Sequence, residues 1–156
     1  MPVLLLLPEL TEEEQAPILS TFDNYSMGGS MDIKIVSTDK APAAIGPYSQ
    51  GVQAGRITFF SGQLGIDPST GKLAEGGVKE QTEQSLKNIA ALLSSIGAAP
   101  SDVIKSTVFL VDMGDFGTVN EIYGKFFAET YPARSCVAVH QLPLNARVEI
   151  EVVVAK

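Results

Sequence analysis

The sequence has one cysteine, one histidine and no tryptophan among its 156 residues. A single cysteine cannot form a disulfide within the chain, and this pattern is typical of a reducing compartment. We therefore expect a cytoplasmic protein. Neither a cysteine pair nor a histidine pair occurs at the spacing of metal ligands, so no metal site is predicted.

Long hydrophobic runs are also missing. A membrane-spanning helix needs roughly 20 consecutive apolar residues. The run from Val3 to Leu7 ends at Pro8 and has no basic residue before it, which also makes it a poor secretory signal. We expect no membrane partner.

Basic residues are scarce, and their distribution excludes one class of ligand. The net charge is -7; residues 1–30 carry five acidic residues and no Lys or Arg, whereas the rest of the chain holds 13 acidic and 11 basic residues. The main body is thus nearly balanced and has no Lys/Arg run. A nucleic-acid binder would present a basic patch, so we predict no nucleic-acid partner.

The charge boundary coincides with a boundary in composition. The segment "SMGGS" (26–30) is typical of a flexible linker, and Met31 looks like a second start. We interpret residues 1–30 as an appended leader and residues 31–156 as one globular domain. Thr11 and Glu14 have capping-box spacing, so a short partner-binding helix in the leader remains an alternative.

From Met31 onward, apolar residues recur at the regular spacings of strands and helices. Residues 33–37 are strand-like, 41–51 form a Pro- and Gly-containing loop, and apolar segments on both sides of Gly55 and Arg56 predict a hairpin. Residues 67–77 have the composition of turns throughout. The spacing of three and four residues then predicts a helix over 78–97 that ends at Gly97; its apolar positions are Leu86, Ile89, Leu93 and Ile96.

In the second half of the chain, the residue pattern predicts a strand within 102–113, a helix within 115–131, and strands at 134–140 and 146–155. The second helix presents Phe116, Val119, Ile122 and Phe126 on one stripe and should close at Pro132. The order β-β-β-α-β-α-β-β indicates an α+β fold with two helices on one face of a mixed sheet. The other face would be left without cover, so we expect a homo-oligomer.

Candidate chemistry centres on "PARSCVAV" (132–139), where Arg134 and Cys136 point to one face of a strand. If the turn at 141–146 pairs Ala138 with Glu149, then Glu149 and Glu151 share that face. An arginine to bind a carboxylate and a glutamate to move protons would then line one pocket. From spacing alone, a structural ion pair between them is the favoured alternative.

Cys136 has no readable activating base, so a small buried core residue is the default for it. The glycines around Lys72 lack the order of a phosphate-binding loop.

The residues from about 31 to 156 resemble the RidA family of reactive intermediate deaminases. The resemblance is carried by "APAAIGPYSQG", "FFSGQLGIDPSTGKL", "QTEQSLKNIAALL", "STVFLVDMGDFGTVNEIYGKFF", "YPARSCVAVHQLP" and "VEIEVVVA". It implies a chorismate-mutase-like α+β fold and a homotrimer with three active sites between subunits. It also implies hydrolysis of enamines and imines such as 2-aminoacrylate to 2-keto acids and ammonia, without a cofactor.

The resemblance implies a role for each matching residue. Arg134 would clamp the substrate carboxylate, and Glu149 would orient or activate the attacking water. Tyr48 would cover the pocket, and Ser61 with Gly62 would approach the substrate.

Two further residues match with less defined roles. Cys136 would line the pocket mainly through its main chain, and Asn120 would lie near the subunit boundary, where packing is an equally good explanation. Three alternative functions remain open: a ribonuclease or translation inhibitor, a non-enzymatic keto-acid-binding sensor or chaperone, and a chorismate mutase.

Overall fold

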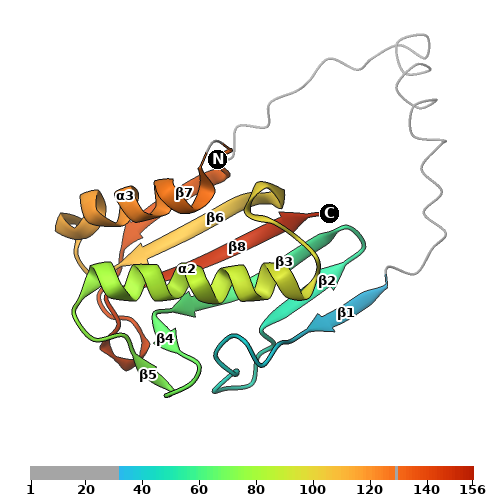
Figure 1. Cartoon of the computed structure of the whole chain (residues 1–156), viewed down its shortest axis with the longest axis horizontal. Coiled ribbons are helices and arrows are strands. Elements are labelled where there is room, and N and C mark those ends of the chain that lie inside the picture. Colours follow the sequence, from blue (N-terminus) through green and yellow to red (C-terminus); the bar gives the residue numbers. More distant parts are fainter. Residues whose placement is uncertain (1–31, 129) are drawn as a thin grey trace, which may run out of the picture. The chain divides into compact units, whose positions relative to one another are not determined.

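The computed structural model describes residues 32–128 and 130–156 (Figure 1). The predicted leader, residues 1–30, lies outside this part of the chain. The strands are β1 (Ile33–Val36), β2 (Gly51–Ala54), β3 (Ile57–Leu64), β4 (Ile66–Asp67), β5 (Lys72–Leu73), β6 (Val103–Leu110), β7 (Ala133–Ala138) and β8 (Val148–Ala155). The helices are α2 (Val78–Ser95) and α3 (Phe116–Phe127), with single 3-10 turns η1 (Pro100–Asp102), η2 (Met113–Asp115) and η3 (Pro143–Asn145).

The predicted element order is confirmed, with one addition. The small β4–β5 hairpin pairs Asp67 with Lys72 inside the segment 67–77 that was predicted as turn throughout, and Ile66 just before it pairs with Leu73. In the described part of the chain, no helix is both long and apolar enough to cross a membrane.

Six strands form one mixed sheet in the order β1-β2-β3-β8-β6-β7. Only β6 and β7 are parallel, because α3 connects them by a crossover, whereas the other neighbours are antiparallel. Figure 1 shows α2 and α3 on the same face of this sheet. The predicted α+β architecture is therefore confirmed.

The predicted pairing of Ala138 with Glu149 is wrong. Ala138 pairs with Leu110 of β6, and Glu149 pairs with Phe109 on the other edge of that same strand. The crossover through α3 returns the chain to the outer edge of β6, so β6 separates β7 from β8. The loop from 139 to 147 therefore crosses β6 to connect β7 with β8, and it does not form a hairpin.

The core lies between the helices and the sheet. Helix α2 buries Leu86, Ile89 and Leu93, as its spacing predicted, against strand residues such as Ile150. On α3 the buried face is rotated relative to the predicted apolar stripe. Val119, Tyr123 and Phe127 are fully buried, while Phe116, Ile122 and Phe126 are only partly buried. The helix ends at Phe127, before the predicted stop at Pro132.

The opposite face of the sheet carries exposed apolar side chains. Ile35 pairs with Val52, which pairs with Phe59, so these side chains form one row across β1, β2 and β3. Ile35 is 65% exposed and Phe59 is 54% exposed. No element of the described residues covers this row, and the predicted open face is confirmed.

Candidate active site

A cavity of about 510 Å³ lies beside the ends of β3 and β8. Its lining comes from the loop before β2, from β3 and β4, from η3 and from Glu149 of β8. Most of the lining is apolar, including Ile45, Leu64 and Leu144, and the polar groups are few. A small apolar cavity with a few convergent polar groups is the usual form of a site for a small molecule.

A β-bulge in β3 gives this cavity its shape. Phe60 pairs with Val152 and Gln63 pairs with Ile150, so Ser61 and Gly62 together stand opposite one residue of β8. Bulges of this kind redirect side chains beside functional sites. A Cβ atom on Gly62 would lie 2.7 Å from Cδ of Glu149, and only glycine leaves room for that carboxylate.

The loop that carries Tyr48 is held in place by partly buried hydrogen bonds. The Gln50 side-chain amide donates to the Pro42 carbonyl at 2.8 Å and accepts from the Thr38 amide at 2.7 Å. The Ser61 hydroxyl donates to the Ser49 carbonyl at 2.7 Å. Tyr48 lies between these fastening points in the sequence; it is half-exposed and lines the cavity together with Ser61 and Gly62.

Glu149 is the ionisable group of the cavity with a perturbed environment. Its burial disfavours the charged form and raises the pKa of the carboxyl group, and the Glu151 carboxylate raises this pKa further. No residue in the described ranges forms an ion pair with Glu149. A carboxylate whose pKa is shifted toward neutrality is suited to accept and return a proton.

Arg134 lies in a separate groove formed by α3 and β7. The guanidinium carbon stands 4.7 Å from the centre of the Tyr123 ring and 5.6 Å from that of Phe116. The Tyr123 hydroxyl is itself fixed by a 2.7 Å hydrogen bond with the Ser106 hydroxyl. Asn120 and Tyr131 line the same groove.

These contacts hold Arg134 through the ring faces and leave its N–H groups available. Among residues 32–128 and 130–156, no carboxylate forms an ion pair with it. A guanidinium held in this way can bind a carboxylate through two parallel hydrogen bonds.

Cys136 lies on the same face of β7 as Arg134 but in a different environment. It is partly buried and packs against the core beneath α3. Burial raises the pKa of its thiol, and the nearby Arg134 offsets this only in part. The thiol form therefore dominates near neutral pH, and this form is a poor nucleophile.

The predicted site residues thus fall into two separate places within one chain. Tyr48, Ser61, Gly62 and Glu149 line the cavity, whereas Arg134 and Asn120 line the groove. The prediction that Glu149 and Glu151 share a face with Arg134 is wrong. Arg134 pairs with Ser106 and lies on the helix face, while Glu149 pairs with Phe109 and lies on the opposite face.

Two supporting residues escaped the sequence analysis. Tyr123 was not singled out because its partner Arg134 is distant in sequence, although its place between Val119 and Phe127 at helical spacing could have revealed its burial. Gln50 gave no signal, since a loop glutamine is usually exposed. Within the described ranges, no group of three or more His, Cys, Asp or Glu side chains could hold a metal ion.

Comparisons with known proteins show the family to which the chain is similar. A family model described as endoribonuclease L-PSP matches residues 38–156. A mouse protein named 2-iminobutanoate/2-iminopropanoate deaminase is 53% identical over 120 residues, which cover 77% of this chain and 89% of the mouse protein. An Arabidopsis thaliana protein named Reactive Intermediate Deaminase A, chloroplastic, is 52% identical over 78% of this chain and 65% of its own length.

Solved structures show the same fold. The crystal structure of Escherichia coli TdcF with bound serine superposes with a TM-score of 0.76 at 45% sequence identity. The match covers 79% of this chain and 98% of the TdcF chain.

Proposed function

The chain belongs to the endoribonuclease L-PSP family and within it to the RidA deaminases, and we propose that it hydrolyses small enamines and imines such as 2-aminoacrylate to 2-keto acids and ammonia. The observation that carries this proposal is Glu149. Its carboxyl group projects into an apolar cavity beside Gly62, and its pKa is raised by burial. Such a group can exchange protons repeatedly with a bound substrate near neutral pH.

We propose that each complete site forms between two chains of a homotrimer. Arg134 and Glu149 lie on opposite faces of the sheet, so one chain cannot direct both groups at one small molecule. A neighbouring copy packed on the exposed row of Ile35 and Phe59 would bury that apolar face. In a closed trimer, the cavity of each chain would then meet the groove of the next, giving three sites.

The proposed chemistry consists of proton transfers around one carbon atom. The enamine first takes a proton on its methylene carbon, gives up one proton from its nitrogen and becomes the imine. Water adds to the imine carbon, its proton passing through Glu149 to the nitrogen, to give a carbinolamine. The carbinolamine then loses ammonia and leaves the 2-keto acid.

Arg134 of the neighbouring chain would bind the substrate carboxylate throughout this sequence. General acid–base help of this kind contributes about two to four powers of ten in rate. No step uses a cofactor or a nucleophilic side chain, and we place the reaction in the cytoplasm.

A direct test couples the protein to a dehydratase that releases 2-aminoacrylate in the presence of semicarbazide. We expect the protein to lower semicarbazone formation and to speed the release of pyruvate. An unchanged semicarbazone yield at saturating protein would overturn the deaminase proposal. In a parallel arm, cleavage of a fluorescent RNA without any deaminase activity would instead favour a ribonuclease.

A further inference from the structure

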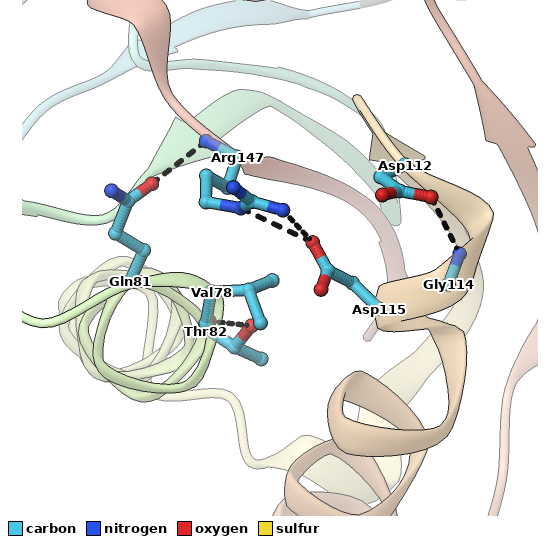
Figure 2. Close-up of polar contacts among 7 residues, drawn as sticks. All are labelled: Val78, Gln81, Thr82, Asp112, Gly114, Asp115 and Arg147. Carbon is cyan, nitrogen blue, oxygen red and sulfur yellow. Dashed lines mark hydrogen bonds and ion pairs between the residues drawn. The ribbon is translucent and has the colours of Figure 1, made fainter.

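Arg147, two residues before Glu149, is held by contacts from α2, from η2 and from Val111 after β6; Figure 2 shows the contacts with Gln81 and Asp115. Its backbone N–H donates to the Gln81 side-chain oxygen of α2 at 2.8 Å, and its carbonyl accepts from the Val111 amide after β6 at 3.2 Å. Its guanidinium donates to Oδ2 of Asp115 through Nη2 at 2.7 Å and through Nε at 3.2 Å.

Burying polar groups costs free energy, so polar contacts gathered at one position indicate that they hold this part of the backbone in place. The Asp115 side chain is only 19% exposed, and Gln81 is buried. A buried amide and a partly buried carboxylate thus contact one position of the chain, Arg147, whose own side chain is 43% exposed. That position is where β8 begins, and Glu149 is the second residue of this strand.

Asp115 also immediately precedes α3. Phe116, the first residue of that helix, packs beneath Arg134. The ion pair between Arg147 and Asp115 therefore joins the strand that carries Glu149 to the helix that supports Arg134.

We propose that Gln81, Arg147 and Asp115 form a positioning unit that fixes the start of β8 and thereby seats the Glu149 carboxylate against Gly62. The inference rests on the proposed function, because it assigns these residues to the support of the proton-transferring group. None of the three lines the cavity or the groove, so they are positioning residues and not catalytic ones.

The unit acts through position and not through its charge. Arg147 is neutralised by Asp115, with Asp112 nearby, and both carboxylates raise the pKa of the guanidinium. A cation acting on Glu149 would lower the pKa of the carboxyl group, whereas this pKa is raised by burial and by Glu151. The other titratable group at the cavity is Tyr48, and the strand neighbours Phe109 and Leu64 do not titrate.

The test compares Asp115→Asn and Gln81→Met with Asp102→Asn. Asp102 approaches Lys156 at the opposite end of β8, so its variant removes a carboxylate near the same strand but far from Glu149. For Asp115→Asn and Gln81→Met we expect kcat to fall about ten-fold, with KM changed less than about two-fold, because small misplacements of a reacting group cost this much. Arg147→Lys keeps the charge but loses the second N–H contact, and its kcat should be intermediate.

A second readout follows Glu149 itself. Its side-chain carboxyl ¹³C signal, titrated by NMR, should give a lower pKa in Asp115→Asn and Gln81→Met, because a carboxylate that leaves its buried seat regains water. The acid limb of kcat/KM should move to lower pH by the same amount. Asp102→Asn should match the unmodified protein in kcat and in both pKa readouts.

The proposal is overturned if the Asp115 and Gln81 variants match Asp102→Asn in kcat and in the Glu149 titration. It is also overturned if they lose activity only in proportion to a loss of folded protein, measured by circular dichroism in the same samples. Failure of the proposed function is a different result, since the unmodified protein would then lack deaminase activity. The NMR titration tests the seating of Glu149 even in that case.

Discussion

Arg134 and Cys136 stand two residues apart on β7 and share a face of the sheet, yet their surroundings suit different tasks. Two aromatic rings hold the Arg134 guanidinium, which no carboxylate of the described residues neutralises. The Cys136 thiol packs against the core, and burial raises its pKa. From these surroundings we propose that Arg134 binds an anion and that Cys136 fills space in the core.

The first prediction separates these two residues by substitution. Arg134→Ala should lower kcat/KM by about ten-fold or more, because each charge-assisted hydrogen bond to the substrate carboxylate contributes roughly 1.5–3 kcal/mol. Arg134→Lys should recover little of this loss, since an ammonium group lacks the planar fork. Cys136→Ser should remain clearly active. Steady-state kinetics on the three variants would contradict these roles if the serine variant were inactive and the alanine variant active.

Gly62 shows what a single residue can and cannot reveal in a sequence. The glycine could be recognised as part of the "SGQ" segment, and its match to the deaminase family predicted that it approaches the substrate. The physical reason for a glycine at this position is different and depends on the bulge in β3. A side chain at position 62 would occupy the place of the Glu149 carboxylate. No sequence period encodes the contact of two residues that are distant in sequence.

At the scale of elements, local patterns predicted most of the fold. Alternating residues in β8 and the three-and-four spacing in α2 depend on near neighbours, and both elements were found. The pairing of β7 depends instead on where the crossover through α3 returns, which is a long-range choice. That choice placed Arg134 and Glu149 on opposite faces of the sheet, which local patterns could not predict, and the roles of these residues stay predictions.

The two helices end differently, and this difference predicts a stabilising substitution. Helix α2 is followed by Gly97 at φ 66°, whereas α3 is followed by Ala128 at φ 52°, a conformation that disfavours a Cβ atom. We expect Ala128→Gly to raise the free energy of unfolding by about 1 kcal/mol and Gly97→Ala to lower it by about as much. Urea unfolding at one protein concentration would measure both. A destabilised Ala128→Gly protein would contradict this explanation.

At the scale of the whole molecule, the cavity and the groove of one chain are separate surfaces. The cavity around Glu149 and the groove around Arg134 open on different sides of the sheet, and apolar residues remain exposed between β1 and β3. Both features have one explanation if copies of the chain pack in a closed ring. The oligomer would then be required for activity as well as for burying the apolar face.

The most direct test of this account mixes two inactive variants, Arg134→Ala and Glu149→Gln, each confirmed as a trimer by light scattering. After the chains are exchanged by unfolding and refolding at equal amounts, some interfaces combine an intact Arg134 with an intact Glu149 from the neighbouring chain. In a closed three-fold ring with random mixing, about a quarter of the interfaces have this combination, so about a quarter of the deaminase activity should return. If the mixture stays as inactive as the separate variants, the two residues do not meet between chains, and the account is contradicted.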